Sequence, residues 1–314
     1  YSKPLPVVKV KIGYLSTIYH TSLIIKNLNK EICGEKIDWQ LYATGPAMID
    51  GFDSGEIDLG YIGLPPVMIG INKGIGLKCI AGGHVEGTVM VASAKYESYT
   101  SKKDINEIIS QFDGKTIGVP SRGCIHDVII KKIIGNHNIK IKNYGWADLI
   151  PYALEDGEID AGVGTPAMAV AASSIASSKV IIPPEQLWHY NPSYGITIKE
   201  EILDEKREFV KEFLMVHENI CNMIREFPIK TSKIASAELG LENNLFALNA
   251  FKISPKYCSS LPEEYINSTL KFLPILKDLG YLSSNLESKD IFDTELIEKI
   301  HTIKPHYENP WNLI

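Results

Sequence analysis

Three of the eight histidines and one of the five cysteines lie where predicted turns could gather them into one cleft, namely His20, His84, His126 and Cys124. Such side chains bind metal ions or redox cofactors. Cys124 and His126, however, are only two residues apart, and on one helix residues at that spacing face different sides. The sequence has no CxxC pair and no GxSxG, HExxH or P-loop motif. We therefore predict no catalytic residue, no metal site and no cofactor.

Residues 121–124, Ser-Arg-Gly-Cys, lie at a predicted turn between a strand and a helix. The N-terminus of a helix offers unpaired N–H groups and a positive dipole end, which suit a sulfonate, carboxylate or phosphate. Gly123 permits close approach of the backbone, and Arg122 could add a bidentate contact. We predict that Ser121, Arg122, Gly123 and Cys124 bind an anionic ligand. The alternative is an ordinary capped turn with Arg122 in solvent.

The first half of the sequence has a corresponding turn at Ser16 and Thr17, with His20 about one helical turn further on. A ligand between two helix N-termini would be clamped from both sides. We therefore predict contacts from Ser16 and Thr17. His20 is a further candidate, and the alternative for it is a packing role on its helix.

The segment 83–88 carries two side chains that could bind a charged group of a ligand, His84 and Glu86. The imidazole of His84, with an unperturbed pKa of about 6.5, could face a carboxylate or another anion. Glu86 could bind the ammonium group of a zwitterion. The alternative is a polar hairpin turn that does not contact the ligand.

Aromatic and small residues near strand ends and crossovers could complete a pocket. Aromatic side chains more often lie in a protein core, which is the alternative for each of them. The predicted additional contacts are Tyr61, Gly63, Trp146, Gly164, Thr165, Trp188 and Tyr190.

An internal repeat indicates how these residues are positioned. The segment GEIDLG at 55–60 recurs as GEIDAG at 157–162, 102 positions later. Upstream, KIGYLS at 11–16 resembles TIGVPS at 116–121, with an offset of 105. The two halves are therefore predicted to contain the same α/β unit.

Strand composition and helical spacing define the elements of each unit. The predicted strands are 7–15, 37–43, 57–62, 115–119, 139–144 and 159–163, and the predicted helices are 18–28, 48–53, 125–134, 149–155 and two that begin near Pro65 and Pro166. This alternation implies mostly parallel sheets covered by helices, with ligands beyond the carboxyl ends of the strands.

We predict an α/β fold of two lobes that close like a clamshell, each a mostly parallel sheet flanked by helices. The first lobe would contain residues 7–91 and 188–314, and the second residues 92–187. Two crossovers would then form a hinge.

The segment after the second repeat completes the first lobe in this prediction. Strands at 180–182 and 194–198 would return to it, and the helical tail from Arg207 would pack against it.

Length and charge limit the class of protein. The 314 residues are enough for two domains. A net charge of −6 and a pI of about 5.8 argue against a nucleic-acid partner. No apolar run is long enough to predict a membrane span. The opening YSKPLP, residues 1–6, has the composition of a linker, and we expect a removed export signal ahead of it.

With the repeat in view, the sequence resembles the nitrate/sulfonate/taurine-type solute-binding proteins of ABC importers, which include relatives that bind thiamin-pyrimidine precursors. The resemblance covers nearly the whole chain and rests on four segments: IGY at 12–14, GEID at 55–58 followed by Pro65, DGKTIGVP at 113–120, and the region 153–161. It implies a type II periplasmic-binding-protein fold and an exported protein, often lipid-anchored, that passes its ligand to a membrane permease.

The main prediction is an extracytoplasmic, monomeric solute-binding protein for a small anionic organic molecule, similar to a sulfonate or taurine. An enzyme on the same scaffold, related to the thiamin-pyrimidine or menaquinone-pathway branches, is the alternative, and Cys124 with the histidines would serve it. The CCCFC motif of one enzyme branch is absent. A sensing domain would require fused segments that this sequence lacks.

Overall fold

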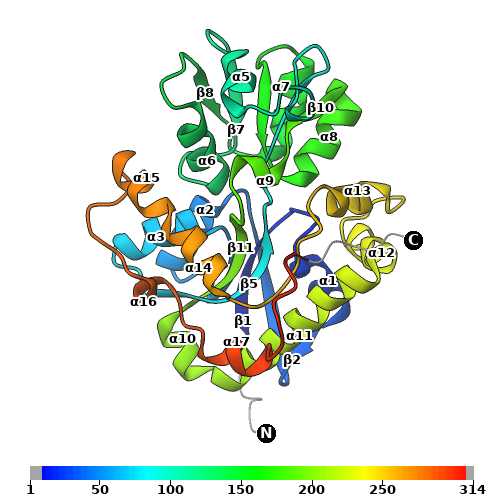
Figure 1. Ribbon diagram of the computed structural model, residues 1–314. Helices are drawn as coiled ribbons and strands as arrows, with labels where there is room; N and C mark the ends of the chain where they lie inside the picture. Colours follow the sequence, from blue (N-terminus) through cyan, green and yellow to red (C-terminus); the bar gives the residue numbers. More distant parts are fainter. Residues whose placement is uncertain (1–8, 309–314) are drawn as a thin grey trace, which may run out of the picture.

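Two β-sheets, each flanked by helices, make up the computed structural model, which describes residues 9–308 (Figure 1). The first sheet has the order β2-β3-β1-β4-β11-β5. Its strands are β1 (Val10–Leu15), β2 (Glu31–Ile32), β3 (Glu35–Tyr42), β4 (Leu59–Ile62), β5 (Leu77–Val85) and β11 (Pro192–Lys199). The expected linker 1–6 and the first two residues of the strand expected at 7–15 lie outside the described residues.

The second sheet has the order β10-β6-β9-β7-β8. Its strands are β6 (Val89–Ser93), β7 (Thr116–Val119), β8 (Lys140–Asn143), β9 (Ala161–Gly164) and β10 (Ser178–Ile182). β10 therefore stays in the second sheet, and the expectation that 180–182 returns to the first was wrong. Its pairing with β6 explains why, since residues 178–182 lie antiparallel to residues 90–93.

Both sheets are mixed, with one reversed strand inserted among parallel ones, and the short edge strand β2 of the first sheet is also antiparallel to its neighbour β3. β1, β3 and β4 are parallel, whereas β11 runs antiparallel to β4 and β5. In the second sheet β7, β8 and β9 are parallel, and β6 is antiparallel to β9. β6 and β11 are the strands that follow a crossover. The chain enters each of these strands from the other sheet, and each strand therefore runs antiparallel to the parallel strands of its own sheet.

The sequence repeat has a common structural basis in both halves. Asp58 accepts a hydrogen bond from the N–H of Lys11 at 2.9 Å, and Asp160 accepts one from the N–H of Thr116 at 3.0 Å. The isoleucine before each aspartate reaches the glycine of the neighbouring strand, where a Cβ atom would clash. Each GEID segment thus joins the third strand of its unit to the first.

Helices cover the sheets as the alternation predicted. Those at the first sheet include α1 (Thr21–Leu28), α2 (Gly45–Asp53) and α3 (Leu64–Asn72), and those at the second are α4 (Tyr99–Lys102), α5 (Ile105–Ser110), α6 (Ile125–Ile134), the 3₁₀ helix η1 (Ala147–Leu149), α7 (Ile150–Glu155), α8 (Pro166–Ala176) and α9 (Pro184–Leu187). α1 begins three residues later than expected, because residues 17–20 form a turn closed by the bond from His20 N–H to Thr17 O.

The C-terminal part of the chain contacts both sheets' layers. It comprises α10 (Glu200–Glu205), α11 (Arg207–Glu226), α12 (Pro228–Glu238), α13 (Leu245–Ile253), α14 (Glu263–Leu270), α15 (Phe272–Asp278), α16 (Ser288–Ile291) and α17 (Glu295–Ile300). α11 packs on α1 as expected, but α13 packs on α8 and α15 on α6 (Figure 1). Packing against the first lobe alone was therefore too narrow an expectation. None of the helices among residues 9–308 is at once long and apolar enough to cross a membrane.

Two crossovers connect the sheets, at residues 86–88 and 188–191. The expected division at residue 91 falls inside β6, which already belongs to the second sheet. The sheets therefore favour a boundary in the first crossover, and the division into lobes stays a prediction.

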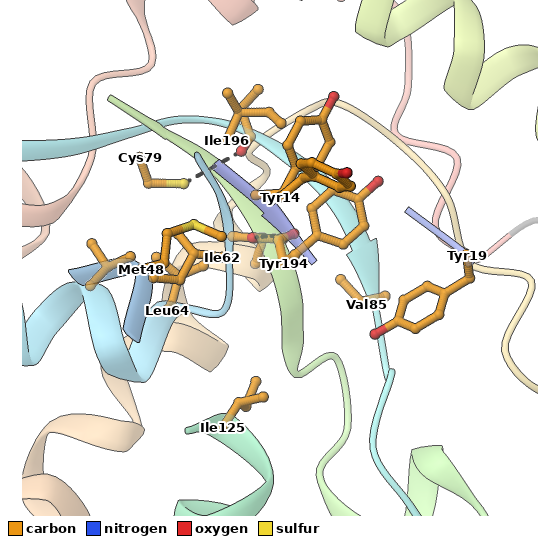
Figure 2. Close-up of a cluster of buried hydrophobic side chains, with 14 of the residues drawn as sticks. Tyr14, Tyr19, Met48, Ile62, Leu64, Cys79, Val85, Ile125, Tyr194 and Ile196 are labelled. Carbon is orange, nitrogen blue, oxygen red and sulfur yellow. Dashed lines mark hydrogen bonds between the residues drawn. The ribbon is translucent and has the colours of Figure 1, made fainter. Parts of the chain in front are cut away.

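The main apolar core continues from one sheet to the other. Figure 2 shows Met48 of α2, Ile62 of β4 and Tyr194 of β11 on one side of this cluster, and Ile125 of α6 on the other. All four side chains are at most 5% exposed. The two halves are thus in apolar contact around the region where their strands end.

Candidate functional site

A cavity of about 60 Å³ lies where the strands of both sheets end. It is lined by Leu15, Thr17, Tyr19, His20, Ala43, Thr44, Gly45, Gly63, Pro66, Pro120, Cys124, Ile125, His126, Ala147, Thr165 and Ser193. About 10–15 Å³ of such space is enough to hold one water molecule. The space therefore suits a solute of few heavy atoms.

Within residues 9–308, five helices begin at this cavity, and the N-cap residue of each lines it. The N-caps are His20 of α1, Thr44 of α2, Gly63 of α3, Cys124 of α6 and Thr165 of α8. Each helix N-terminus carries unpaired N–H groups and a positive partial charge of about half a unit. Together they make the cavity electropositive without any cationic side chain.

Two threonine hydroxyls add hydrogen-bond donors to these N–H groups. Thr44 Oγ1 accepts from the N–H of Ala47 at 3.4 Å, and Thr165 Oγ1 accepts from the N–H of Met168 at 3.1 Å. Because the oxygens serve as helix caps, their hydrogens are available to a ligand. Thr44 was missed in the sequence, although it precedes Gly-Pro as Thr165 precedes Pro166, and that similarity was the available signal.

Two neutral histidines face the same space. Burial lowers the pKa of His126 to about 4 and holds the pKa of His20 well below its usual value. His126 Nδ1 is 2.9 Å from Thr88 Oγ1, while the buried Nδ1 of His20 has no hydrogen-bond partner among the described residues. His126 was set aside because it lies only two positions after Cys124. Cys124 is the N-cap, however, and not part of the helix, so both line the cavity.

Among residues 9–308, no lysine, arginine, aspartate or glutamate lines the cavity. The nearest buried carboxylate on α6, that of Asp127, accepts from the N–H of Gly123 and pairs with Lys131, both at 2.9 Å. Its charge is therefore matched outside the cavity. An anion here would be held by neutral donors and helix dipoles alone.

Five of the predicted residues line the cavity: Thr17, His20, Gly63, Cys124 and Thr165. The others do not, namely Ser16, Tyr61, His84, Glu86, Ser121, Arg122, Gly123, Trp146, Gly164, Trp188 and Tyr190. Ser16, Ser121 and Gly164 are immediate chain neighbours of lining residues, and Ser121 Oγ is a buried atom with no partner among the described residues.

Arg122 does not point into the cavity, contrary to the prediction. It is exposed and lines a second groove, here called the outer groove, together with Gly123, Lys73 and Tyr281. This groove adjoins the cavity, because Pro66 lines both. Gly123 adopts the left-handed conformation, with φ +85°. The tight turn that brings Cys124 to the cavity thus leaves Arg122 on the other side.

His84 and Glu86 contact other parts of the protein and do not line the cavity, where their predicted ligand roles would place them. His84 is fully buried, with Nδ1 3.0 Å from Ser193 Oγ and Nε2 2.5 Å from Ser254 O. Burial lowers its pKa to about 3, so it stays uncharged. Glu86 pairs with Lys256 at 2.7 Å and is 1% exposed.

The predicted aromatic walls also lie elsewhere. Tyr61 is fully buried behind α1, and its hydroxyl is 3.1 Å from Thr21 Oγ1. Trp146 is 40% exposed, and the indole of Trp188 stacks on Phe272 at 4.1 Å.

Tyr190 likewise packs away from the cavity, edge-on against Tyr307 at 5.4 Å. The aromatic residue that does line the cavity is Tyr19, whose hydroxyl is 3.1 Å from Ser193 Oγ. No pattern in the sequence distinguishes Tyr19 from the other tyrosines.

Cys124 is a buried thiol. Burial raises its pKa to about 12, so the nucleophilic thiolate is not formed near neutral pH. No group of three metal-ligating side chains occurs within residues 9–308. The cavity therefore offers hydrogen bonds and electrostatic attraction.

Comparison with known sequences identifies the family. The model of the NMT1-like family matches residues 3–237, and the chain belongs to this family. No curated protein matches the sequence.

Solved structures share the fold at low sequence identity. The ligand-binding component of an ABC-type import system from Staphylococcus aureus, with zinc bound, has a TM-score of 0.77 at 16% identity, over 94% of this chain and 99% of that one. The alkanesulfonate-binding protein SsuA from Xanthomonas axonopodis pv. citri, bound to MOPS, has a TM-score of 0.76 at 15% identity, over 92% and 99%. The periplasmic nitrate-binding protein NrtA from Synechocystis PCC 6803 has a TM-score of 0.74 at 13% identity, over 95% and 89%. The chain thus has the type II periplasmic-binding-protein fold.

Proposed function

We propose that this chain is the solute-binding component of an ABC-type importer and that it captures a small anionic solute between its two lobes. The observation that carries the proposal is the convergence of five helix N-termini on a cavity without a charged side chain. Carboxylates would repel an anion, and none from residues 9–308 lines the cavity. An anion would replace its hydration shell with fixed N–H and O–H donors.

The relatives support this class of ligand. One similar structure is an alkanesulfonate-binding protein and another a nitrate-binding protein, and both ligands are oxyanions. The cavity of about 60 Å³ favours a compact oxyanion over a long-chain sulfonate. Because the apolar core already joins both halves, larger ligands would require the lobes to separate further.

The same proposal includes a partner and a location. The protein would act outside the cytoplasm as a monomer, with or without a lipid anchor, and would deliver its solute to a membrane permease. Its lobes would move about the crossovers 86–88 and 188–191, and the two left-handed residues Glu86 and Tyr190 lie in these segments.

Binding without chemistry is the proposed activity. An enzyme on this scaffold would need an activated nucleophile or an acid–base pair at the cavity. Cys124 stays protonated, and His126 and His20 are uncharged because burial lowers their pKa values. These groups can donate or accept hydrogen bonds to a bound solute.

A thermal-shift panel tests the proposal. The solutes would be nitrate, hydrogencarbonate, short alkanesulfonates, sulfamate, methylphosphonate, taurine, small carboxylates and thiamin-pyrimidine precursors. A true ligand at about 100 times its Kd adds about 2.7 kcal/mol to the free energy of unfolding, which raises the melting temperature. A Thr44→Val variant should lose most of that shift, because it removes a hydroxyl from the cavity wall.

Two results of this panel would contradict the proposed function. Stabilisation by a thiamin-pyrimidine precursor and by no anion would replace the anionic ligand with a heterocycle. Turnover of any bound solute would replace the binding protein with an enzyme.

A further inference from the structure

A buried hydrogen-bond relay ends at the cavity wall and has a fixed direction. The Tyr19 relay consists of Tyr19, Ser193, His84 and Ser254. Tyr19 Oη is 3.1 Å from Ser193 Oγ, which is 3.0 Å from His84 Nδ1. On its other side, His84 Nε2 is 2.5 Å from the backbone oxygen of Ser254. Tyr19 and Ser193 line the cavity, whereas His84 does not.

The carbonyl of Ser254 sets this direction, because a carbonyl oxygen can only accept. His84 Nε2 therefore carries the hydrogen, and in a neutral imidazole Nδ1 must then accept. The hydroxyl of Ser193 donates to Nδ1 and has no second hydrogen. Tyr19 must therefore donate to Ser193. Burial lowers the pKa of His84 and raises that of Tyr19, so both keep these protonation states.

Toward the cavity, the two relay oxygens thus have lone pairs and no hydrogen to offer. Tyr19 and Ser193 are 2% and 7% exposed, so bulk water does not satisfy them once a solute fills the space. Elsewhere on the wall, the hydroxyls of Thr44 and Thr165 and the helix N–H groups are donors. The wall therefore has donors at the helix N-termini and at Thr44 and Thr165, and acceptors at Tyr19 and Ser193.

We propose that the ligand is a compact oxyanion that also carries an O–H or N–H donor, which it directs at Tyr19 and Ser193. This inference rests on the proposed function and narrows its ligand class. A fully deprotonated oxyanion such as an alkanesulfonate would place an oxygen or a methyl group against the relay and leave its acceptors unmatched. An ammonium donor is disfavoured, because no carboxylate of the described residues lines the cavity to balance its charge.

A second relay supplies a matched control away from the cavity. The Tyr61 relay consists of Tyr61, Thr21, His217 and Gly82. His217 Nε2 is 2.8 Å from Gly82 O, and Nδ1 is 2.8 Å from Thr21 Oγ1, which is 3.1 Å from Tyr61 Oη. None of these residues lines the cavity. Breaking this relay perturbs a buried hydroxyl–histidine bond of the same kind without changing the wall.

Titration calorimetry with three solutes of nearly equal shape provides the test. Methanesulfonate has no donor, sulfamate has an N–H donor, and methylphosphonate has an O–H donor at a pH where it is a monoanion. We expect sulfamate or methylphosphonate to bind at least about tenfold more tightly than methanesulfonate. The stronger of the two identifies the donor as N–H or O–H.

A Ser193→Ala variant reports on the direction of the relay. It frees the Tyr19 hydrogen for the ligand, so the preference for the donor-bearing solute should fall to less than about threefold or reverse toward methanesulfonate. A Tyr19→Phe variant removes the Tyr19 acceptor but leaves the lone pairs of Ser193 and the His84–Ser254 bond, so the preference should narrow to less than half of the wild-type ratio without reversing. The Tyr19→Phe variant provides the test if Ser193→Ala does not fold. Thr21→Val should keep the wild-type preference.

Two results would overturn the inference: methanesulfonate binding as tightly as both donor-bearing solutes, or a preference that survives in both Ser193→Ala and Tyr19→Phe. Either leaves the proposed function intact, because an oxyanion still binds. Failure of all three solutes, together with failure of every anion in the panel, would count against the proposed function itself.

Discussion

The carboxylate of Glu86 accepts a hydrogen bond from the backbone N–H of Tyr190 at 2.9 Å, and so a residue of the first crossover holds the second. The N–H of Glu86 in turn donates to Asn191 O at 2.8 Å. Both Glu86 and Tyr190 have left-handed backbones, with φ +61° and +60°. Lys256, which lies in the C-terminal part of the chain, forms an ion pair with the Glu86 carboxylate. The two connections between the sheets are thereby fastened to each other.

Replacing this carboxylate by an amide should destabilise the fold. In Glu86→Gln the amide oxygen can still accept from Tyr190, but Lys256 loses its ionic partner. Because Lys256 is 24% exposed, we expect a loss of about 1–3 kcal/mol in the free energy of unfolding, less than for a fully buried pair. Urea denaturation measures it. Glu201→Gln, which removes the exposed pair with Lys199, is the control and should cost less than about 1 kcal/mol. Equal losses in the two variants would contradict the special role of Glu86.

Gly63, at the start of α3, lies against Ile125 of α6, and we expect this contact to limit how closely the two halves approach. A Cβ atom on Gly63 would lie 3.4 Å from Cβ and Cγ2 of Ile125, at the start of α6. Alanine therefore just fits, whereas the branched side chain of valine would push against Ile125. We expect Gly63→Val to weaken ligand binding about tenfold or more and to increase the radius of gyration of the liganded protein, measured by calorimetry and small-angle X-ray scattering. Gly63→Ala should behave like the wild type. Unchanged affinity in Gly63→Val would show that this contact does not limit closure.

The buried histidines should make the protein sensitive to mild acid. Burial lowers the pKa of His84 to about 3 and those of His126 and His217 to about 4. In the unfolded chain the histidine pKa values are about 6.5. At pH values between the folded-state pKa values and about 6.5, the unfolded chain therefore binds more protons than the folded protein. Stability is full above about pH 6.5 and falls as the pH drops toward the folded-state values, by about 1.4 kcal/mol per histidine per pH unit.

Denaturant unfolding at pH 7 and pH 5 measures this dependence. His217→Gln removes one of these groups and should show a shallower slope than the wild type, after allowance for its lower stability at pH 7. A free energy of unfolding that is equal at both pH values would contradict the neutral, buried state of these side chains.

Arg122 should be dispensable for binding. Its side chain is exposed in the outer groove and does not line the cavity. We expect Arg122→Ala to change the affinity less than twofold. Thr165→Val removes a hydroxyl from the cavity wall and a helix N-cap, and should weaken binding about tenfold and cost about 1 kcal/mol of stability. If Arg122→Ala abolished binding, the ligand would lie in the outer groove.

Much of the architecture could be predicted because local chemistry repeats along the chain. The GEID segments revealed the duplicated unit, and Asp58 and Asp160 make the same contact in each copy. The strand-to-helix turns at Thr17, Gly63 and Thr165 followed from the rule that ligands bind at the carboxyl ends of parallel strands. These predictions depended on elements that are close in sequence.

The remaining site residues depend on contacts between distant segments. Ser193 reaches the cavity because β11 inserts between β4 and β5, and periodicity does not reveal strand order. The direction of Arg122 depends on the left-handed backbone of Gly123. His84 and Glu86 have the residue types of a binding site, but Ser254 and Lys256, about 170 residues later, engage them. Residue type alone could not distinguish a ligand contact from a buried structural pair.

A crystal structure of the protein with the tightest-binding solute of the panel would show where the ligand binds. We expect the solute to lie between the sheets, with its oxyanion at the N-termini of α2, α6 and α8 and within hydrogen-bond distance of Thr44 or Thr165. A solute bound in the outer groove beside Arg122, or one held by a charged side chain away from these helix N-termini, would contradict the proposed site.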